Sequence, residues 1–297
     1  MPELPEVEVV RAGLADHVVG RRIAVAEVRG ERVARRHAGG AAALAERLTG
    51  RTPTSAERRG KFLWLALDDA SALVTHLGMS GQMLVLPPDD PAVRHEHARL
   101  DFEDEGPSLR FADQRTFGGW SVEPLVTDPF GGDHPGGVPA STTHIAPDPF
   151  EAVFDAEVVA ARLVTRRGPV KRAVLDQGLV SGVGNIYADE ALWRTGVHGE
   201  RPGTALTRPA ARRLIGHLQD VMAEALEQGG TSFDALYVNV NGASGYFDRR
   251  LAVYGQQGRP CPRCGATVLR SPFDGRSSHW CPACQTRPRH APKGDVR

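Results

Sequence analysis

Four cysteines near the end of the chain constrain its fold more than any other feature. Cys261 and Cys264 form one pair, Cys281 and Cys284 form the other, and the sequence holds no further cysteine. Two residues lie inside each pair and sixteen lie between the pairs, a spacing typical of tetrahedral zinc sites. Because thiolates supply all four ligands, the pattern predicts one structural Zn²⁺ with no open position for a substrate. The alternative, two disulfides or free thiols, is uncommon in a cytoplasmic chain.

Length and composition describe a globular protein with more than one domain. The chain has 297 residues, of which 41% are hydrophobic and 24% are charged, and this length allows two domains with cores of their own. The sequence contains no apolar run of about 18 residues and no basic start followed by an apolar stretch. We therefore expect neither a membrane span nor a signal peptide, and the cytoplasm is the expected location.

Charge is unevenly distributed, although the formal net charge is zero. Residues 101–150 hold nine acids and two bases, whereas residues 251–297 hold eight bases and two acids. A basic C-terminal module presents a positive local field even where the sum is zero, so nucleic acid is a candidate partner. A solvated basic tail is the plainer alternative.

The chain divides into a β-rich half and a helical half. Six short runs rich in β-branched or aromatic residues predict a sandwich or barrel, and they are residues 21–28, 61–67, 71–79, 82–86, 98–103 and 108–112. Gly and Pro crowd residues 128–149, which we interpret as a linker. The predicted domains are a β domain at 1–127, a helical domain at 150–250, and a metal-binding module with a tail at 251–297.

Helical patterns occupy most of the second half. Helices are predicted at residues 157–165, 169–177, 182–196 and 208–230, and Asn185 is suited to capping the third of them. The Gly- and Asn-rich stretch 231–247 is predicted to be a loop.

The first eight residues, MPELPEVE, combine an amine nucleophile with carboxylic acids. Removal of Met1 would leave Pro2 with a free α-amine, and such amines titrate near about 8, so that a useful fraction is neutral at pH 7. Glu3 and Glu6 are close enough in sequence to share a site with this amine, a pairing suited to Schiff-base chemistry. The same stretch also fits an ordinary helix start, and the two interpretations are compatible.

Lysine is rare in this chain. Only three of the 36 basic residues are lysines, namely Lys61, Lys171 and Lys293. Where arginine serves almost everywhere, a retained lysine indicates a position that needs a compact ammonium group. Lys293 lies in the tail, so Lys61 and Lys171 are the candidate functional lysines.

Two further stretches are predicted to be loops with side chains of interest. Residues 75–81 (THLGMSG) carry Met79, and residues 113–120 (DQRTFGGW) carry Arg115 and Phe117. For Met79 and Phe117, packing in the core is the alternative.

Five stretches, taken in order, carry a family resemblance. MPELPEVE, GKFLWL, THLGMSG, GVGNIYADEAL and the four-cysteine finger resemble the formamidopyrimidine-DNA glycosylases, from residue 1 to about residue 285. The resemblance implies an α+β multidomain fold: an N-terminal β-sandwich with the leading helix packed on it, a helix-two-turn-helix domain and a C-terminal zinc finger. It implies base-excision repair of oxidised purines such as 8-oxoguanine and formamidopyrimidines, with cleavage of abasic sites by β,δ-elimination. The implied partner is duplex DNA containing such lesions, bound by a monomer at the nucleoid.

The resemblance assigns roles to the N-terminal residues and to one lysine. Pro2 matches the nucleophile that attacks C1′ of the damaged nucleotide, and Glu3 matches the acid that protonates the sugar ring oxygen. Glu6 matches a second carboxylate of the site. Lys61 matches a lysine that contacts a phosphate and assists the reaction.

The remaining roles concern DNA contacts. Lys171 matches a lysine near the lesion, and Asn185 and Arg276 match the two residues that grip the phosphate beside it. The side chains that fill the space left by the extruded base match Met79, Arg115 and Phe117.

The chain departs from the family pattern in one loop. Gln114 and Thr116 stand where proline and a second arginine are usual, which puts a backbone contact in doubt. Residues 238–247 match the region of the lesion-capping loop. Two rivals are an endonuclease VIII-like glycosylase for oxidised pyrimidines and a lesion-binding protein without catalysis; ELPEVE and the three gap-filling side chains favour the purine enzyme.

Overall fold

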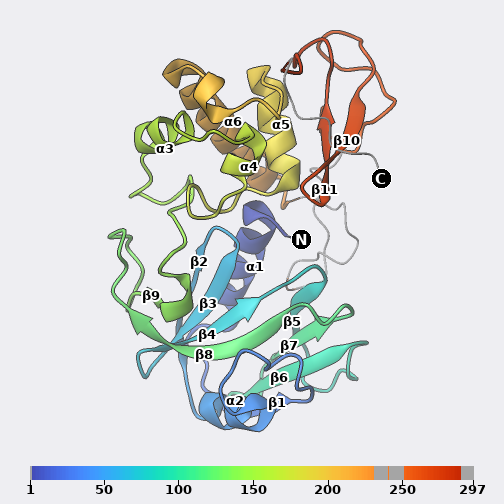
Figure 1. Cartoon of the computed structure of the whole chain (residues 1–297). Helices are drawn as coiled ribbons and strands as arrows, with labels where there is room; N and C mark the ends of the chain where they lie inside the picture. Colours follow the sequence, from blue (N-terminus) through green and yellow to red (C-terminus); the bar gives the residue numbers. More distant parts are fainter. Residues whose placement is uncertain (1, 231–239, 241–250, 289–297) are drawn as a thin grey trace. The chain divides into compact units, whose positions relative to one another are not determined.

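The computed structural model describes residues 2–230, 240 and 251–288 (Figure 1). The chain forms two compact units. The first comprises Met1–His144 and Ala225–Phe247, and the second comprises Ile145–Glu224 and Asp248–Arg297.

Two antiparallel sheets build the first unit. The four-stranded sheet has the order β1 (Ile23–Val28), β6 (Glu96–Phe102), β7 (Ser108–Asp113) and β5 (Gly81–Leu86). The five-stranded sheet has the order β2 (Pro53–Arg59), β3 (Phe62–Leu67), β4 (Ser71–His76), β8 (Gly119–Val126) and β9 (Val138–Pro139). Both sheets contribute to one apolar core, so the predicted sandwich is confirmed.

Two helices pack on these sheets. Helix α1 (Leu4–His17) contacts β2 and β3, and helix α2 (Gly40–Leu48) contacts β1 and β8. Helix α1 buries Leu4, Val7, Val10 and Leu14, because these residues recur at the three- and four-residue spacing of one helix face. The leading helix thus has its N-terminus fixed to the β domain.

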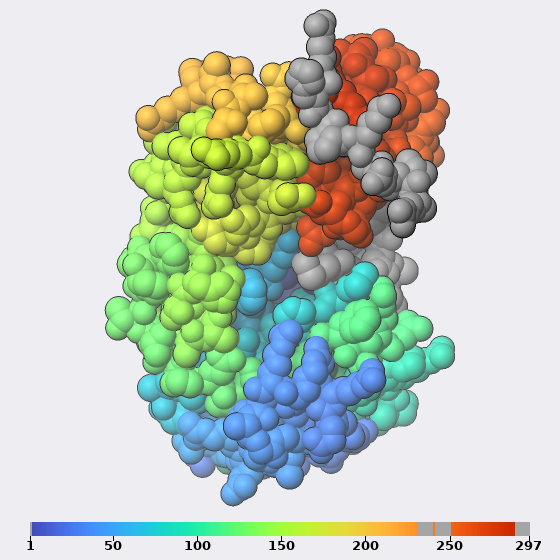
Figure 2. All heavy atoms as spheres, in the orientation of Figure 1, coloured from blue at the N-terminus to red at the C-terminus, as the bar shows by residue number. Residues whose placement is uncertain are grey.

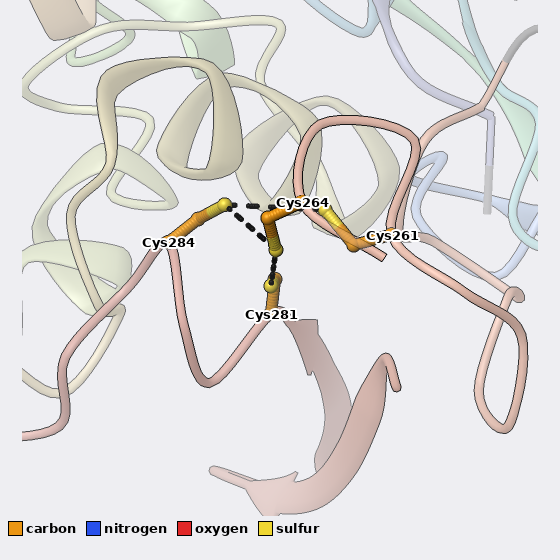
Figure 3. A group of neighbouring side chains, drawn as sticks. All are labelled: Cys261, Cys264, Cys281 and Cys284. Carbon is orange, nitrogen blue, oxygen red and sulfur yellow. Dashed lines mark hydrogen bonds between the residues drawn. The ribbon is translucent and has the colours of Figure 1, made fainter. Parts of the chain in front are cut away.

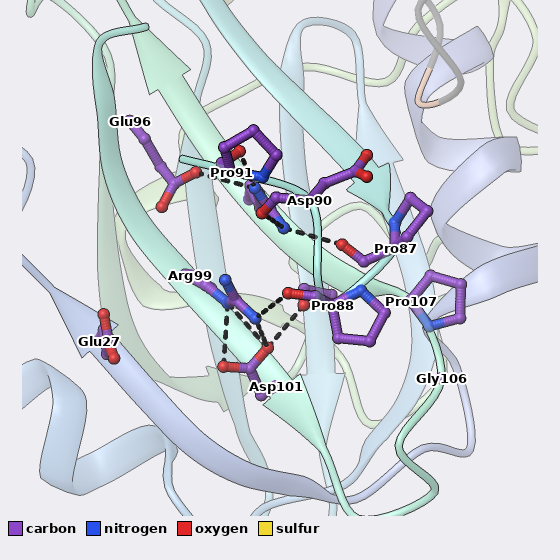
Figure 4. A network of polar contacts seen from close by, with 12 residues as sticks. Glu27, Pro87, Pro88, Asp90, Pro91, Glu96, Arg99, Asp101, Gly106 and Pro107 are labelled. Carbon is purple, nitrogen blue, oxygen red and sulfur yellow. Dashed lines mark hydrogen bonds and ion pairs between the residues drawn. The ribbon is translucent and has the colours of Figure 1, made fainter. Parts of the chain in front are cut away.

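A polar network stiffens the four-stranded sheet (Figure 4). Arg99 on β6 donates to Asp101 on the same strand at 2.8 Å. Arg110 on β7 is fully buried. It donates to three main-chain carbonyls of the loop after β5, those of Pro87, Asp90 and Pro91. A buried arginine needs such acceptors because an unpaired charge in the interior is costly.

Among its described residues the second unit contains four α-helices, the last of which runs three residues into the first unit, and a β-hairpin. The helices are α3 (Ala156–Leu163), α4 (Val170–Val174), α5 (Asn185–Thr195) and α6 (Arg208–Glu227), and the hairpin joins β10 (Leu269–Phe273) to β11 (Arg276–Trp280). Asp274 and Gly275 both have positive φ, as a two-residue hairpin turn requires. The finger (red) lies against the helical part of the same unit (yellow to orange) (Figure 2).

The structure contains several elements that the sequence patterns do not predict, among them β2, β8 and α2 of the first unit. Strand β8 begins inside the stretch 113–120 predicted to be a loop, because it pairs with both β4 and β9 and buries Trp120. Strand β2 is polar, and a bulge between Pro53 and Ser55 breaks its alternation. Tertiary pairing thus overrides local preference in both strands.

The stretch 128–149 is only partly a connection between the units. Residues 128–144 belong to the first unit and carry β9. The predicted domain limits remain a prediction. No helix in the described part of the chain has the length and apolar character needed to cross a membrane.

Candidate active site

The N-terminal segment places two carboxylates directly after Pro2. Pro2 is buried, and Glu3 and Glu6 are 3% and 7% exposed. Glu3 is the N-cap of α1, and its backbone N–H donates to Oε2 of Glu6 at 2.9 Å in a capping box. The helix-start interpretation is confirmed. The same cap fixes both acids in the turn that follows Pro2, whose role as nucleophile stays a prediction.

Helix α1 is tied to the hairpin that carries Lys61. Glu8 accepts hydrogen bonds from Arg58 at 2.6 Å and from Arg11, and Arg11 also donates to the Ala56 carbonyl. Burial raises the pKa of Glu8, but the Arg11 and Arg58 guanidinium groups outweigh it and lower the pKa. Lys61 is half-buried and lies in the β2–β3 turn. The ion pair between Glu8 of α1 and Arg58 of β2 thereby helps to fix the turn that carries Lys61.

A second ion pair, which is buried, also anchors the end of β2 that leads into this turn. Arg59 and Asp128 are both buried, and Arg59 Nη1 donates to Oδ1 of Asp128 at 2.8 Å. Asp128 also accepts the backbone N–H groups of Phe130 and Gly132. The Arg59 hydrogen bonds lower the pKa of Asp128 to about 2. Nothing in the sequence pattern indicated this pair, because its members lie 69 residues apart.

Met79, Arg115 and Phe117 lie on two loops that meet. A Cβ at Gly78 would come within 2.6 Å of the Gly118 nitrogen, so the loop carrying Met79 contacts the loop carrying Arg115 and Phe117 backbone to backbone. Phe117 is 47% exposed and Arg115 is exposed, while Met79 is half-buried. Core packing is therefore wrong for Phe117. The Arg115 guanidinium carbon lies 5.0 Å from the centre of the Phe117 ring.

Lys171 lies inside the second unit. Its side chain is fully buried, and Nζ lies 2.6 Å from Oδ1 of Asp189. Nζ also donates to the Ser277 carbonyl at 3.1 Å. The described structure therefore pairs this lysine with a carboxylate of α5 instead of presenting it at the surface.

Asn185 has a different role from the predicted cap. The N-cap of α5 is Gly184, and Asn185 is the first helical residue. Its side-chain amide donates to the Ser277 carbonyl at 2.9 Å. Arg276, at the start of β11, is exposed. Lys171, Asn185 and Arg276 are thus gathered around one stretch of β11.

Arg276 borders a basic cavity within the second unit. The cavity has a volume of about 670 Å³, and its charged lining residues are Arg166, Arg167, Arg172, Asp176, Asp274 and Arg276. Arg172 pairs with Asp274 at 2.6 Å, and this ion pair connects α4 to the hairpin turn. Four guanidinium groups against two carboxylates give the cavity a positive field suited to anions.

The four cysteines converge (Figure 3). Their Sγ atoms all lie within 4.8 Å of one another, with separations of 3.4, 3.5 and 3.9 Å for three of the pairs. Zn–S bonds of about 2.3 Å place tetrahedral sulfurs about 3.8 Å apart, so the set fits a metal ion. Sulfurs joined in a disulfide would lie about 2.05 Å apart, so the disulfide alternative is wrong.

Two adjacent carboxylates of α5, Asp189 and Glu190, also organise the second unit, and no sequence motif singles them out. Asp189 accepts the N–H of His279 and the hydroxyl of Ser278, both on β11. Glu190 is buried, and burial raises its pKa. It accepts three successive backbone N–H groups, those of Ala252, Val253 and Tyr254. In the sequence, these two roles are indicated only by an acidic pair inside a helix whose other residues are mostly apolar.

Three family models match most of the chain. They are the formamidopyrimidine-DNA glycosylase N-terminal domain at residues 1–120, the H2TH domain of the same enzymes at 145–235, and the zinc finger found in FPG and IleRS at 258–287. Taken with the sandwich and the four-cysteine site, these matches define a DNA glycosylase of the helix-two-turn-helix class.

Whole-chain relatives agree with the domain matches. Formamidopyrimidine-DNA glycosylases of Salinispora arenicola and Nocardia farcinica are 57% and 54% identical, over 98% and 97% of this chain and 98% and 99% of theirs. A Lactococcus lactis Fpg structure in complex with DNA containing an abasic site is 31% identical, covers 96% of this chain and all of that chain, and gives a TM-score of 0.82. The chain belongs to the formamidopyrimidine-DNA glycosylase family.

Proposed function

We propose that Pro2 is the nucleophile with which this protein, as an oxidised-purine glycosylase of base-excision repair, attacks the damaged nucleotide. The amine nitrogen forms a bond to C1′, the bond from C1′ to the purine breaks, and the base leaves with a proton. The observation that carries the proposal is the burial of Pro2 directly before a capped helix whose first turn holds two carboxylates. A lysine would need a strongly lowered pKa for the same task, whereas an α-amine titrates near about 8.

Glu3 is the proposed proton donor, and Glu6 is the second carboxylate of the proposed site. Glu3 would donate a proton to the sugar ring oxygen as the ring opens, and Glu6 would hold the segment through the Glu3 backbone N–H. The product is an iminium at C1′. This cation acidifies the C2′ proton, so that the bonds from C3′ and then C5′ to the flanking phosphates break by β- and δ-elimination. The protein would thus also be an abasic-site lyase.

Lys61, Asn185 and Arg276 are the proposed phosphate contacts. The half-buried Lys61 sits on an anchored turn, and the exposed Arg276 borders a cavity lined by further arginines. Backbone contacts of this kind hold DNA without reading sequence, as a lesion scanner requires. For Lys171, burial and the pairing with Asp189 favour an indirect role through the Ser277 carbonyl.

Met79, Arg115 and Phe117 are the proposed groups that fill the duplex after extrusion of the lesion. Extrusion costs a few kcal/mol of stacking and pairing, and an exposed aromatic ring beside an apolar thioether can replace part of this stacking. A related structure, that of a Lactococcus lactis Fpg, is a complex with DNA containing Fapy-dG, and a lesion of this kind is the proposed substrate here.

We further propose that the four cysteines bind one structural Zn²⁺. With all four ligand positions taken by thiolates, the ion would fold the finger and take no part in the reaction. The proposed functional form is a monomer bound to duplex DNA at the nucleoid in the cytoplasm.

Borohydride trapping tests the nucleophile. Wild-type protein should form a covalent complex with duplex DNA containing 8-oxoguanine, and Pro2→Gly should lose it, whereas Lys61→Ala should slow trapping without abolishing it. Efficient trapping by Pro2→Gly, together with none by Lys61→Ala, would reverse the assignment. Mass spectrometry should first show that Met1 is absent, because a retained methionine blocks the amine.

The same assay distinguishes the rival functions. We expect faster single-turnover excision of 8-oxoguanine than of thymine glycol from matched duplexes. The reverse order would indicate an endonuclease VIII-like enzyme. Binding to lesion DNA without excision or trapping would indicate a non-catalytic lesion-binding protein.

A further inference from the structure

The loop 114–118, named the wedge loop here, projects Arg115 and Phe117 with little apolar support. Phe117 is 47% exposed, and Thr116 adopts a left-handed backbone conformation with φ 53°, which is unfavourable for a β-branched residue. Hydrogen bonds must therefore determine where this loop sits.

Two N–H groups of the wedge loop, those of Arg115 and Gly118, bond to one carboxylate and one hydroxyl. Asp113 accepts from the backbone N–H of Arg115 at 3.1 Å and of Gly118 at 2.7 Å. Ser80, from the neighbouring loop, also accepts from the Arg115 N–H at 3.0 Å. These bonds hold one side of the loop.

The carbonyl side of the loop is held by Arg35. Its guanidinium group donates to the carbonyls of three successive residues, those of Thr116, Phe117 and Gly118. The Gly118 bond measures 2.7 Å. A planar guanidinium group with five N–H donors can serve several acceptors at once. Arg32 adds a bond of 3.0 Å to the Thr116 hydroxyl.

The segment that bears Arg35 is itself fixed on the sheet. The Val33 carbonyl accepts the N–H of Trp120 at 2.8 Å, and His37 Nδ1 accepts the N–H of Val122 at 3.2 Å. A Cβ at Gly119 would lie 2.5 Å from the Val33 oxygen, so glycine allows this close approach. Arg35 therefore projects from a backbone that is anchored on β8 on both sides of it.

We propose that Arg35 is a positioning residue for the wedge, a role that rests on the proposed function of Arg115 and Phe117. Insertion of these side chains into a base stack pushes back on the loop, because unstacking the bases costs free energy. Main-chain carbonyls that accept hydrogen bonds from a guanidinium group are displaced less easily than carbonyls that bond to water. Loss of the Arg35 guanidinium group should impair insertion of Arg115 and Phe117 while leaving the chemistry at Pro2 intact.

The experiment compares Arg35→Met with the matched control Arg36→Met. Both remove one positive charge from adjacent positions, but among the described residues Arg36 makes no hydrogen bond or ion pair to the wedge loop. Insertion is measured without catalysis, by the fluorescence of 2-aminopurine next to a tetrahydrofuran abasic analogue in duplex DNA. Excision of 8-oxoguanine from duplex DNA and lyase activity on a single-stranded abasic oligonucleotide are measured in parallel.

Arg35→Met should lose most of the fluorescence change and slow duplex excision about ten- to a hundred-fold, as expected for loss of two or three hydrogen bonds from a charged donor. Single-strand lyase activity should stay within about twofold, since no base needs to be extruded. Arg36→Met should keep the fluorescence change, and Arg35→Lys should fall between wild type and Arg35→Met.

Equal effects of Arg35→Met and Arg36→Met on fluorescence would overturn the proposal, as would wild-type insertion by Arg35→Met. A parallel loss of single-strand lyase activity in Arg35→Met would also overturn it, because the defect would then be general. Failure of the proposed function gives a different result: wild-type protein would show neither lyase activity nor trapping, while the fluorescence comparison would still report on Arg35.

Discussion

Gly78 and Gly118 touch through their backbones, and this contact joins the loops that carry Met79 and Phe117. A Cβ at Gly78 would lie 2.6 Å from the Gly118 nitrogen and 2.8 Å from the Phe117 carbonyl carbon. Gly78 also has φ +62°, a conformation that costs other residues energy. Both space and backbone geometry therefore require glycine here.

Gly78→Ala should separate the two loops and slow excision from duplex DNA by more than about tenfold, since a displaced wedge loses its transition-state contacts. Gly20→Ala is the matched control, because Gly20 also has positive φ (+84°) but no atom within 4 Å of its added Cβ. Thermal melting and single-turnover rates check both variants. Equal kinetic effects of the two substitutions would show that backbone strain alone is responsible.

Removal of the metal should unfold the finger and weaken DNA binding sharply. Without an ion, four sulfurs within 4.8 Å of one another lose what holds them together. The Trp193 indole N–H, which lies 3.4 Å from Cys261 Sγ, should report the change through its fluorescence. Chelation followed by DNA titration is the measurement, and added Zn²⁺ should restore binding. Unchanged affinity after verified metal removal would contradict the prediction.

Arg115 should make excision depend on the base opposite the lesion. A guanidinium group offers parallel donors, which match the adjacent N3 and O2 acceptors of cytosine, whereas adenine presents an amino donor beside one acceptor. A bidentate pair discriminates by about 1–3 kcal/mol, so excision opposite cytosine should be about ten- to a hundred-fold faster than opposite adenine. Arg115→Ala should reduce this ratio, chiefly by slowing reaction opposite cytosine. A preference that survives the substitution would exclude Arg115 as the reader.

His76 should make stability depend on pH below neutrality. Burial, then the Arg36 and Arg35 guanidinium groups, lower the pKa of His76 from 6.5 to about 4, against an opposing effect of Asp113. Between pH 6.5 and 4 the unfolded state binds more protons at this site than the folded state, so stability falls as pH falls. His76→Gln should flatten this part of the melting-temperature profile. An unchanged slope would mean that other groups dominate it.

Sequence patterns predict the structure of the two ends of the chain better than that of its middle. The helix start at Glu3 and Glu6 and the four-cysteine site depend on residues close together along the chain, and local patterns can identify both. Strand β2 and helix α2 owe their form to pairing and packing with distant segments, which a local window cannot detect. For the site, the positions of Pro2 and Arg276 follow from motifs. The burial of Lys171 does not, because it depends on Asp189 across an interhelical contact.

The hydrogen bond from Arg32 to Thr116 changes the meaning of a missing arginine. The sequence resemblance predicts an arginine at the position of Thr116, and in this chain the guanidinium group beside Thr116 comes from Arg32. In this chain the positive charge beside Thr116 of the wedge loop therefore comes from a different segment. The residue at position 116 or at position 32 alone is then a poor guide to the electrostatic field at this surface. Exchanging the two residues as a pair, Arg32→Thr with Thr116→Arg, would place the charge on the wedge loop itself.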